Sequence, residues 1–170
     1  MRAVLLNKPW MADILWAGST KSTNGDVTNS KGKFDYWVFK LSSKGTIVWQ
    51  KTLGGKGGDF ATSIQQAKDG GYIVVGYTSA TSRHIGKRND DVTGFHGKMD
   101  YWLVKLTSNG EIAWQKCLGG TENDIASSVQ QTSDGGYVIV GISNSKDGDL
   151  RDNKEKDDIW VVKLLPSKKK

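Results

Sequence analysis

The chain has 170 residues, a formal net charge of +6 and 36% hydrophobic residues, a composition typical of one folded domain rather than a disordered segment. Its one cysteine, Cys117, excludes an intrachain disulfide. No apolar run approaches the roughly 20 residues of a membrane span, and the lysines are spread along the chain apart from residues 168–170, so we expect neither a membrane nor a nucleic acid as partner.

Residues 1–16 contain a short apolar stretch. Pro9 and Asp13 interrupt it, and no small-residue cleavage site follows, so we expect no signal peptide.

The beginning of the chain resembles a degenerate copy of the repeat unit. The segment ILWAG at 14–18 matches YIVVG at 72–76 and YVIVG at 137–141. We therefore assign the beginning of the chain to the same repeat as the rest.

The centre of the chain contains two nearly complete copies of one unit. Residues 35–78 and 100–143 align without a gap at an offset of 65 and are identical at 25 of 44 positions. A third copy opens at Asp158 with DIWVVKLL. A repeat of this strength indicates an architecture of similar units placed side by side. We expect the matched tryptophans, Trp37, Trp102 and Trp160, in equivalent buried positions.

Each unit contains four strand-like runs, which in the second copy are 100–106, 112–118, 125–131 and 137–143. Their apolar residues recur every second position, which excludes helices, and the glycines of SNG and SDGG supply the positive φ that hairpin turns need. Both faces of the run 100–106 are apolar, whereas a two-layer sandwich needs only one such face. The sequence predicts an all-β fold of ten or eleven strands, built as about three four-stranded antiparallel β-propeller blades, the last one incomplete.

We expect a single repeat domain over residues 1–170, with blades at about 1–55, 56–120 and 121–164 and a basic tail at 165–170. Propellers close with about four to eight blades, so three blades leave two apolar sheet faces uncovered. Two chains joined head to tail would supply six blades. The expected partners are therefore a second copy of the chain or further propeller repeats.

The order of the motifs GGYxVxG, DxWxxKL and GxIxW is similar to that of kelch-type blades. The segments GTIVW at 45–49 and GEIAW at 110–114 also resemble the tryptophan-docking repeat of quinoprotein propellers. The closest resemblance is to long bacterial repeat proteins built from units such as DYWVVKLDxxGNIxWQKTxGG…DGGYIVxGYT, and it covers nearly the whole chain. This resemblance implies a β-propeller with more repeats, of a kind that is commonly secreted or surface-linked.

A pair of aspartates nine residues apart recurs before each DYW or DIW strand. The pairs are Asp26 and Asp35, Asp91 and Asp100, and Asp149 and Asp158. Ca²⁺ prefers clustered carboxylates in a flexible loop. Aspartates also build turns by bonding their own backbone, and these loops lack the DxDxDG density of a dedicated calcium loop. A Ca²⁺ site and a purely structural role both stay open, and no other cofactor is indicated.

Segment 79–99 departs from the repeat and is seven residues longer than its equivalents. Long loops on a rigid scaffold commonly carry binding function, and a tolerated insertion is the alternative. Two histidines without a third ligand are a weak signal for a metal. The residues that we expect to contact a ligand are His84, Arg88, Phe95 and His96.

Lys40, Lys105 and Lys163 occupy one position of an otherwise apolar strand, and their recurrence predicts a structural role such as pairing with a neighbouring aspartate. The sequence contains no serine nucleophile motif, no Walker-type loop and no unique carboxylate pair. We expect a non-catalytic scaffold or binding module that contacts protein or carbohydrate through its loops. The alternative is a fragment of a propeller enzyme, a hydrolase or lyase, with its site in other repeats.

Overall fold

The computed structural model describes residues 4–6, 13–79, 91–150, 153–154 and 156–166, and these residues form strands, turns and loops without a helix. None of them forms a helix with the length and hydropathy that a membrane span requires. The strands are β1 (Val4–Leu6), β2 (Ile14–Thr20), β3 (Asp35–Leu41), β4 (Ile47–Leu53), β5 (Asp59–Gln66), β6 (Tyr72–Thr78), β7 (Asp100–Leu106), β8 (Ile112–Leu118), β9 (Asp124–Gln131), β10 (Tyr137–Ser143) and β11 (Asp158–Leu164). The predicted all-β class and strand number are confirmed for the described part of the chain.

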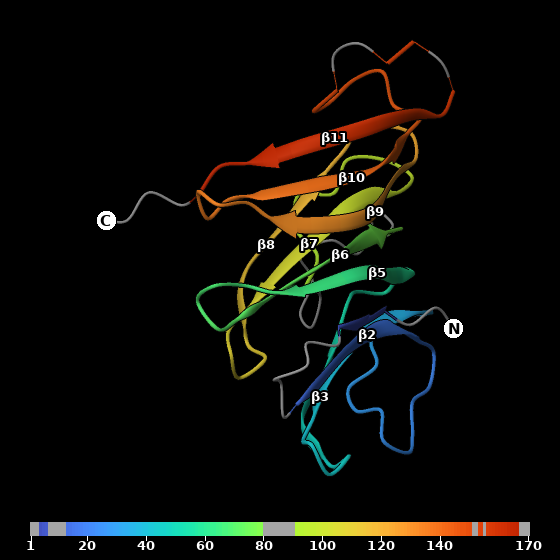
Figure 1. The fold of residues 1–170 in the computed structure, drawn as a ribbon. Helices are drawn as coiled ribbons and strands as arrows, with labels where there is room; N and C mark the ends of the chain where they lie inside the picture. Colours follow the sequence, from blue (N-terminus) through green and yellow to red (C-terminus); the bar gives the residue numbers. More distant parts are fainter. Residues whose placement is uncertain (1–3, 7–12, 80–90, 151–152, 155, 167–170) are drawn as a thin grey trace.

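The strands form three antiparallel sheets in the orders β1-β2-β3-β4, β5-β6-β7-β8 and β9-β10-β11. We call them the first, second and third sheets. Within each sheet every strand pairs with its neighbour in the chain. Figure 1 shows the sheets stacked in chain order, with the second between the other two.

Glycines with positive φ close the hairpins. The N–H of Gly70 donates to the carbonyl of Ala67, and the N–H of Gly135 donates to that of Thr132, each at 3.0 Å. The φ angles of these two glycines are +81° and +88°, a region that is costly for other residues. Their turns join β5 to β6 and β9 to β10, as the repeated DGG motif predicted.

The core consists of two apolar clusters, one on each side of the second sheet. One contains Tyr36 and Val38 of β3 together with Trp102 and Val104 of β7. The other contains Leu103 of β7 and residues of the third sheet. All seven residues of β7 are buried. The second sheet is therefore covered on both faces, as the two apolar faces of its sequence predicted.

The three matched tryptophans hold equivalent positions, but they are not equally buried. Their cross-strand partners are all glycines, Gly18, Gly76 and Gly141. Trp102 is fully buried, whereas Trp37 and Trp160 are half-buried. The prediction of equal burial was wrong because Trp37 lies on the outer face of the first sheet and Trp160 lies on the edge strand of the third.

A tyrosine–tryptophan contact joins each sheet to the next. The hydroxyl of Tyr36 donates to the carbonyl oxygen of Trp102 at 3.0 Å, and the two ring centroids are 4.5 Å apart. Tyr101 and Trp160 repeat the contact at 3.1 Å and 4.6 Å. We call this the Tyr–Trp contact. Its recurrence means that the two interfaces between sheets are built alike.

The glycines opposite the tryptophans leave room for this contact. A Cβ added to Gly76 would lie 2.8 Å from the hydroxyl oxygen of Tyr36, and one added to Gly141 would lie 2.5 Å from that of Tyr101. Real Cβ atoms do not approach other atoms so closely. The Cβ would also lie 2.0 Å from the carbonyl oxygen of Phe60 at Gly76 and 2.1 Å from that of Ile125 at Gly141, both on the adjacent strand of the same sheet. The adjacent strand and the neighbouring sheet therefore both require glycine at this position.

At the other end of the sheets, a lysine from each apolar strand pairs with an aspartate. Lys105 is 6% exposed, and its Nζ lies 2.9 Å from Oδ2 of Asp69. The equivalent pairs are Lys40–Asp13 at 2.8 Å and Lys163–Asp134 at 2.9 Å. The structural role predicted for the three lysines is confirmed.

Candidate binding site

The aspartates expected at a metal site gather at one end of the sheets. Asp35, Asp100 and Asp158 are the first residues of β3, β7 and β11. Oδ2 of Asp35 accepts a hydrogen bond from the N–H of Lys31 at 2.9 Å. The equivalent bonds run from His96 to Asp100 at 2.8 Å and from Lys154 to Asp158 at 2.9 Å. Each carboxylate thus holds the N–H four residues before it and folds the preceding loop.

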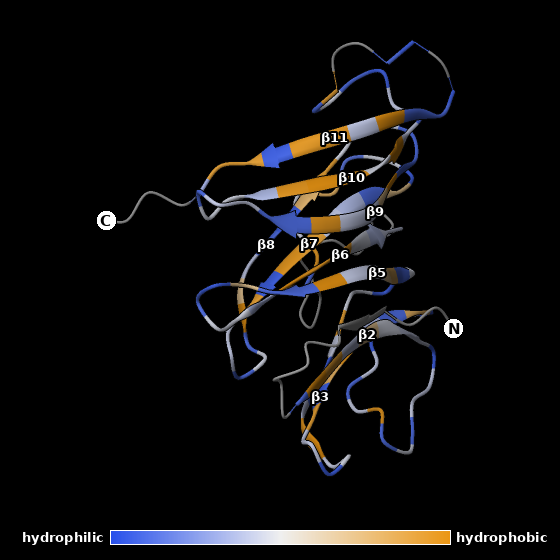
Figure 2. Cartoon of the chain, viewed as in Figure 1, coloured by the Kyte–Doolittle hydropathy of each residue, from blue (hydrophilic) through white to orange (hydrophobic). Residues whose placement is uncertain are grey.

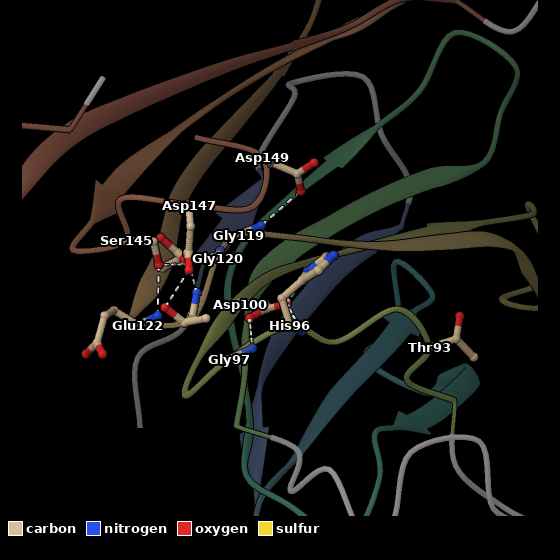
Figure 3. Close-up of polar contacts among 12 residues, drawn as sticks. Thr93, His96, Gly97, Asp100, Gly119, Gly120, Glu122, Ser145, Asp147 and Asp149 are labelled. Atoms are coloured by element: carbon tan, nitrogen blue, oxygen red, sulfur yellow. Dashed lines mark hydrogen bonds and ion pairs between the residues drawn. The ribbon is translucent and has the colours of Figure 1, made fainter. Parts of the chain in front are cut away.

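Two other aspartates of this series, Asp91 and Asp149, reach across to the preceding sheet. The N–H of Gly54 donates to Oδ2 of Asp91 at 3.1 Å, and the N–H of Asp91 donates to the carbonyl of Gly54 at 3.0 Å. Asp149 and Gly119 form the same reciprocal pair at 3.1 Å and 3.0 Å, with the side-chain bond visible in Figure 3. Asp26, on the first sheet, is exposed. Asp91 and Asp149 therefore connect neighbouring sheets.

These contacts bear on the predicted Ca²⁺ site. Most of the hydrogen bonds that these carboxylates accept come from backbone N–H groups, while Oδ1 of Asp35 is buried without a partner among the described residues. Within the described part of the chain, no three His, Cys, Asp or Glu side chains are arranged so that they could hold a metal ion. The contacts give the aspartates a structural role, and a Ca²⁺ site stays the untested alternative.

Sequence analysis missed a network centred on Asp124, the buried first residue of β9. Its Oδ2 accepts hydrogen bonds from Ser145 Oγ and from the N–H of Gly120, each at 2.8 Å, and its Oδ1 accepts one from Ser143 Oγ. Asp59 is fully buried at the equivalent position of β5. The available signal was the recurrence of an aspartate four residues after the second glycine of LGG.

Asp147 ties the loop before β11 to the connection before β9. It accepts hydrogen bonds from the N–H and the hydroxyl of Thr121 at 2.8 and 2.9 Å, and these bonds hold the pKa of Asp147 below its usual 3.8. Figure 3 shows Asp147, Ser145 and Gly120 gathered at this point. Hydrogen bonds therefore hold the connections at this end in place.

Of the four residues expected to contact a ligand, the structure describes two, and these two differ in their exposure to solvent. His84 and Arg88 lie outside the described residues, and Phe95 packs against the core cluster between the first two sheets. The side chain of His96 is 40% exposed, and its Nδ1 lies 2.8 Å from Oδ2 of the buried Asp100. Burial raises the pKa of Asp100 above its usual 3.8, although hydrogen bonds from His96 oppose this shift. Of the described pair, His96 reaches solvent and Phe95 supports the core.

A groove of about 510 Å³ lies between the first and second sheets. Residues 28–31, 50–53 and 110–112 line it, together with Asp91. These residues come from the loop before β3, from β4 and from the turn between β7 and β8. The groove thus joins segments that are about 60 residues apart in the chain. Of the predicted site residues that the structure describes, only Asp91 lines it.

Two ion pairs cross this groove from one sheet to the other. Nζ of Lys31 lies 2.5 Å from Oδ2 of Asp91, and Nζ of Lys51 lies 2.6 Å from Oε1 of Glu111. Among the described lining residues, two cations therefore balance two carboxylates. The lining also includes the apolar side chains of Leu53 and Ile112. Amide and hydroxyl groups line the groove as well and belong to Thr28, Asn29, Ser30, Gln50 and Thr52.

Comparison with models of known protein families gives no match, and comparison with curated proteins gives none either. The function has to be argued from the geometry of the sheets and of the groove between them.

Proposed function

We propose that the chain is a non-catalytic scaffold of the β-propeller type that binds a protein or carbohydrate ligand. The first and second sheets would each be one blade, because propeller blades are small antiparallel sheets of four strands arranged around an axis. The third sheet, with three strands, would be an incomplete blade. The order of the strands and the repetition of the Tyr–Trp contact at both interfaces support this proposal.

The groove between the first and second sheets is the observation that carries the binding function. Its volume falls within the range of about 300–1,000 Å³ that is usual for ligand sites. Its described lining offers donors and acceptors in balance and more polar than apolar surface, which favours a neutral ligand rich in hydroxyl or amide groups. A glycan and a polar peptide segment both have this chemistry.

The charged residues of the repeat take part in structural contacts, which favours binding over catalysis. Lys105 is engaged by Asp69, and Asp91 by Gly54 and Lys31. Groups that recur in every repeat and hold the sheets together are poor candidates for a catalytic role, which requires a unique constellation. A rigid scaffold with loops at one end is suited to binding instead.

A matched pair of substitutions tests the groove. Thr28→Trp places a large ring in the groove and keeps the carbonyl of residue 28, which accepts the hydrogen bond from Thr52 Oγ1 at 2.5 Å. Thr93→Trp is the control, because Thr93 is the exposed equivalent of Thr28 one repeat later and does not line the groove. Binding to an array of glycans and polar peptides is measured for both variants and for the unmodified chain.

We expect the unmodified chain and Thr93→Trp to bind the same member of the array. Thr28→Trp should weaken that binding by at least about tenfold, because a filled groove excludes the ligand. Full retention of binding by Thr28→Trp would overturn the groove as the site. No binding by the unmodified chain to any glycan or peptide would overturn the proposed function.

A further inference from the structure

The two outermost faces of the stack are apolar. On the third sheet the exposed fractions are 77% for Ile159, 59% for Val161, 38% for Ile142 and 36% for Val140. We call this surface the third-sheet face. On the first sheet the outward surface carries Ile14, Trp16, Trp37 and Phe39, which we call the first-sheet face. Figure 2 shows hydrophobic colour along β11 at one end of the stack and along β3 at the other.

Each residue of the first-sheet face has an equivalent in the second sheet that belongs to the core. In register, Trp37 and its partner Gly18 correspond to Trp102 and Gly76. The other equivalences are Ile14 with Tyr72, Trp16 with Val74, and Phe39 with Val104. In the second sheet these residues pack against the first sheet. The first-sheet face therefore has the form of a surface that receives a preceding sheet.

The third-sheet face consists of the complementary positions. Ile159 and Val161 correspond to Tyr101 and Leu103, which in the second sheet pack against the third. Val140 corresponds to Val75 of the same cluster. The third-sheet face is therefore equivalent to the surface that packs against a following sheet.

One substitution distinguishes this outer surface from the internal ones. The position of Tyr36 and Tyr101, whose hydroxyls donate to the tryptophan carbonyls, is occupied by Ile159 in the third sheet. On the opposite surface, Gly18 and Trp37 retain the arrangement that accepts such a hydroxyl. The two faces therefore share apolar character, and the third-sheet face lacks the hydroxyl that would donate the hydrogen bond.

We infer that the third-sheet face of one chain packs against the first-sheet face of a second copy. Two copies joined head to tail at both faces would form a closed ring of six sheets, which lies within the four to eight blades of known propellers. This inference rests on the proposal that the sheets are propeller blades. A second copy of the chain offers each face the surface that it lacks, because each face repeats one half of an existing interface.

The experiment measures the mass of the 170-residue chain in solution by light scattering and its dissociation constant by sedimentation. We expect twice the 18.6 kDa of one chain at micromolar concentration. A mass of one chain would overturn the inference. A series of larger masses would overturn the closed ring, since open head-to-tail contacts produce filaments.

Two substitutions of Ile159 test the predicted register. Ile159→Asp should abolish the dimer, because it buries a charge in an apolar interface. Ile159→Tyr should tighten it by about tenfold or more, since a net hydrogen bond changes an equilibrium constant by up to about tenfold and the ring contains two. Adding Gly18→Ala to Ile159→Tyr should remove this gain, because a Cβ at the equivalent Gly76 would lie 2.8 Å from the tyrosine oxygen.

The control is Ala113→Asp, which places a charge on an exposed residue of the second sheet that belongs to neither face and does not line the groove. It should leave the dimer intact. A failure of Ile159→Tyr to tighten the dimer would overturn the register. Ligand binding reports separately on the proposed function, because the groove lies within one chain and should survive in the monomeric Ile159→Asp variant. The circular dichroism spectrum of that variant establishes that it is folded.

Discussion

The hydroxyl of Tyr36 donates a hydrogen bond to the carbonyl oxygen of Trp102, 66 residues further along the chain, at 3.0 Å. Both side chains are fully buried. The ring of Tyr36 also lies against the indole of Trp102, so one side chain supplies both apolar contact and a hydrogen bond. Burial raises the pKa of Tyr36 well above its usual 10.0, so the hydroxyl stays a donor at neutral pH.

We expect Tyr36→Phe to lower the free energy of unfolding by about 1 kcal/mol and the melting temperature by about 2–4 °C. The substitution removes the hydroxyl and leaves the ring contact in place. Tyr77→Phe is the control, because the half-buried Tyr77 stacks on Phe60 and does not take part in the Tyr–Trp contact. Equal melting temperatures for Tyr36→Phe and the unmodified chain would show that the hydrogen bond adds no net stability.

Gly76→Ala should lower the free energy of unfolding by about 3 kcal/mol, because the new Cβ would lie 2.0 Å from the carbonyl oxygen of Phe60. Gly70→Ala is the comparison. Gly70 has a φ of +81° and open space around it, so its substitution costs about 1 kcal/mol through backbone strain alone. Chemical denaturation measures both values. Similar costs would mean that crowding does not explain the glycine opposite Trp102.

Asp69→Asn should destabilise the chain more than Lys105→Met does. The first substitution leaves the buried ammonium of Lys105 without its carboxylate, whereas the second removes the charge and keeps an apolar stem. The side chain of Asp69 is 63% exposed, so we expect a cost of only about 1 kcal/mol for Asp69→Asn. The opposite ranking in denaturant titrations would mean that the pair stabilises the fold by more than its desolvation costs.

The same aspartate contributes to the acid sensitivity of the chain. Partial burial raises the pKa of Asp69. Hydrogen bonds from Lys105 and from the N–H of Gly71 lower it by more, so the pKa lies below its usual 3.8. Its contribution to stability is therefore present above about pH 4 and is lost as the pH falls through the lowered pKa. Between pH 5 and pH 2 the melting temperature should fall less steeply for Asp69→Asn than for the unmodified chain. Parallel slopes would contradict this assignment.

Calcium and chelators should leave the melting temperature unchanged within about 1 °C. The aspartates of the repeated loops accept hydrogen bonds from backbone N–H groups, as Asp91 does from Gly54 and Asp149 from Gly119. A ligand that binds the native state raises its stability by mass action, so a calcium site would appear as a shift in scanning calorimetry. A gain of several degrees in millimolar Ca²⁺ would show that these loops bind the ion.

Properties that depend on neighbouring residues could be predicted from the sequence. The alternation of apolar residues in segments such as 100–106 gave the strands, and the glycines of DGG and SNG gave the hairpins, because these features depend on backbone geometry within a few residues. The role of Lys105 was predictable because a lysine in an apolar strand has few ways to be satisfied.

Only the tertiary structure decided which residues meet across sheets. The bond from Gly54 to Asp91 and the groove between β4 and the turn at 110–112 join residues that are 37 to about 60 positions apart. In the sequence, Trp37 and Trp102 stand in the same motif, yet one is half-buried and the other fully buried. Burial depends on which sheets lie on either side of a residue, and a motif that is the same in every repeat carries no information about its place in the stack.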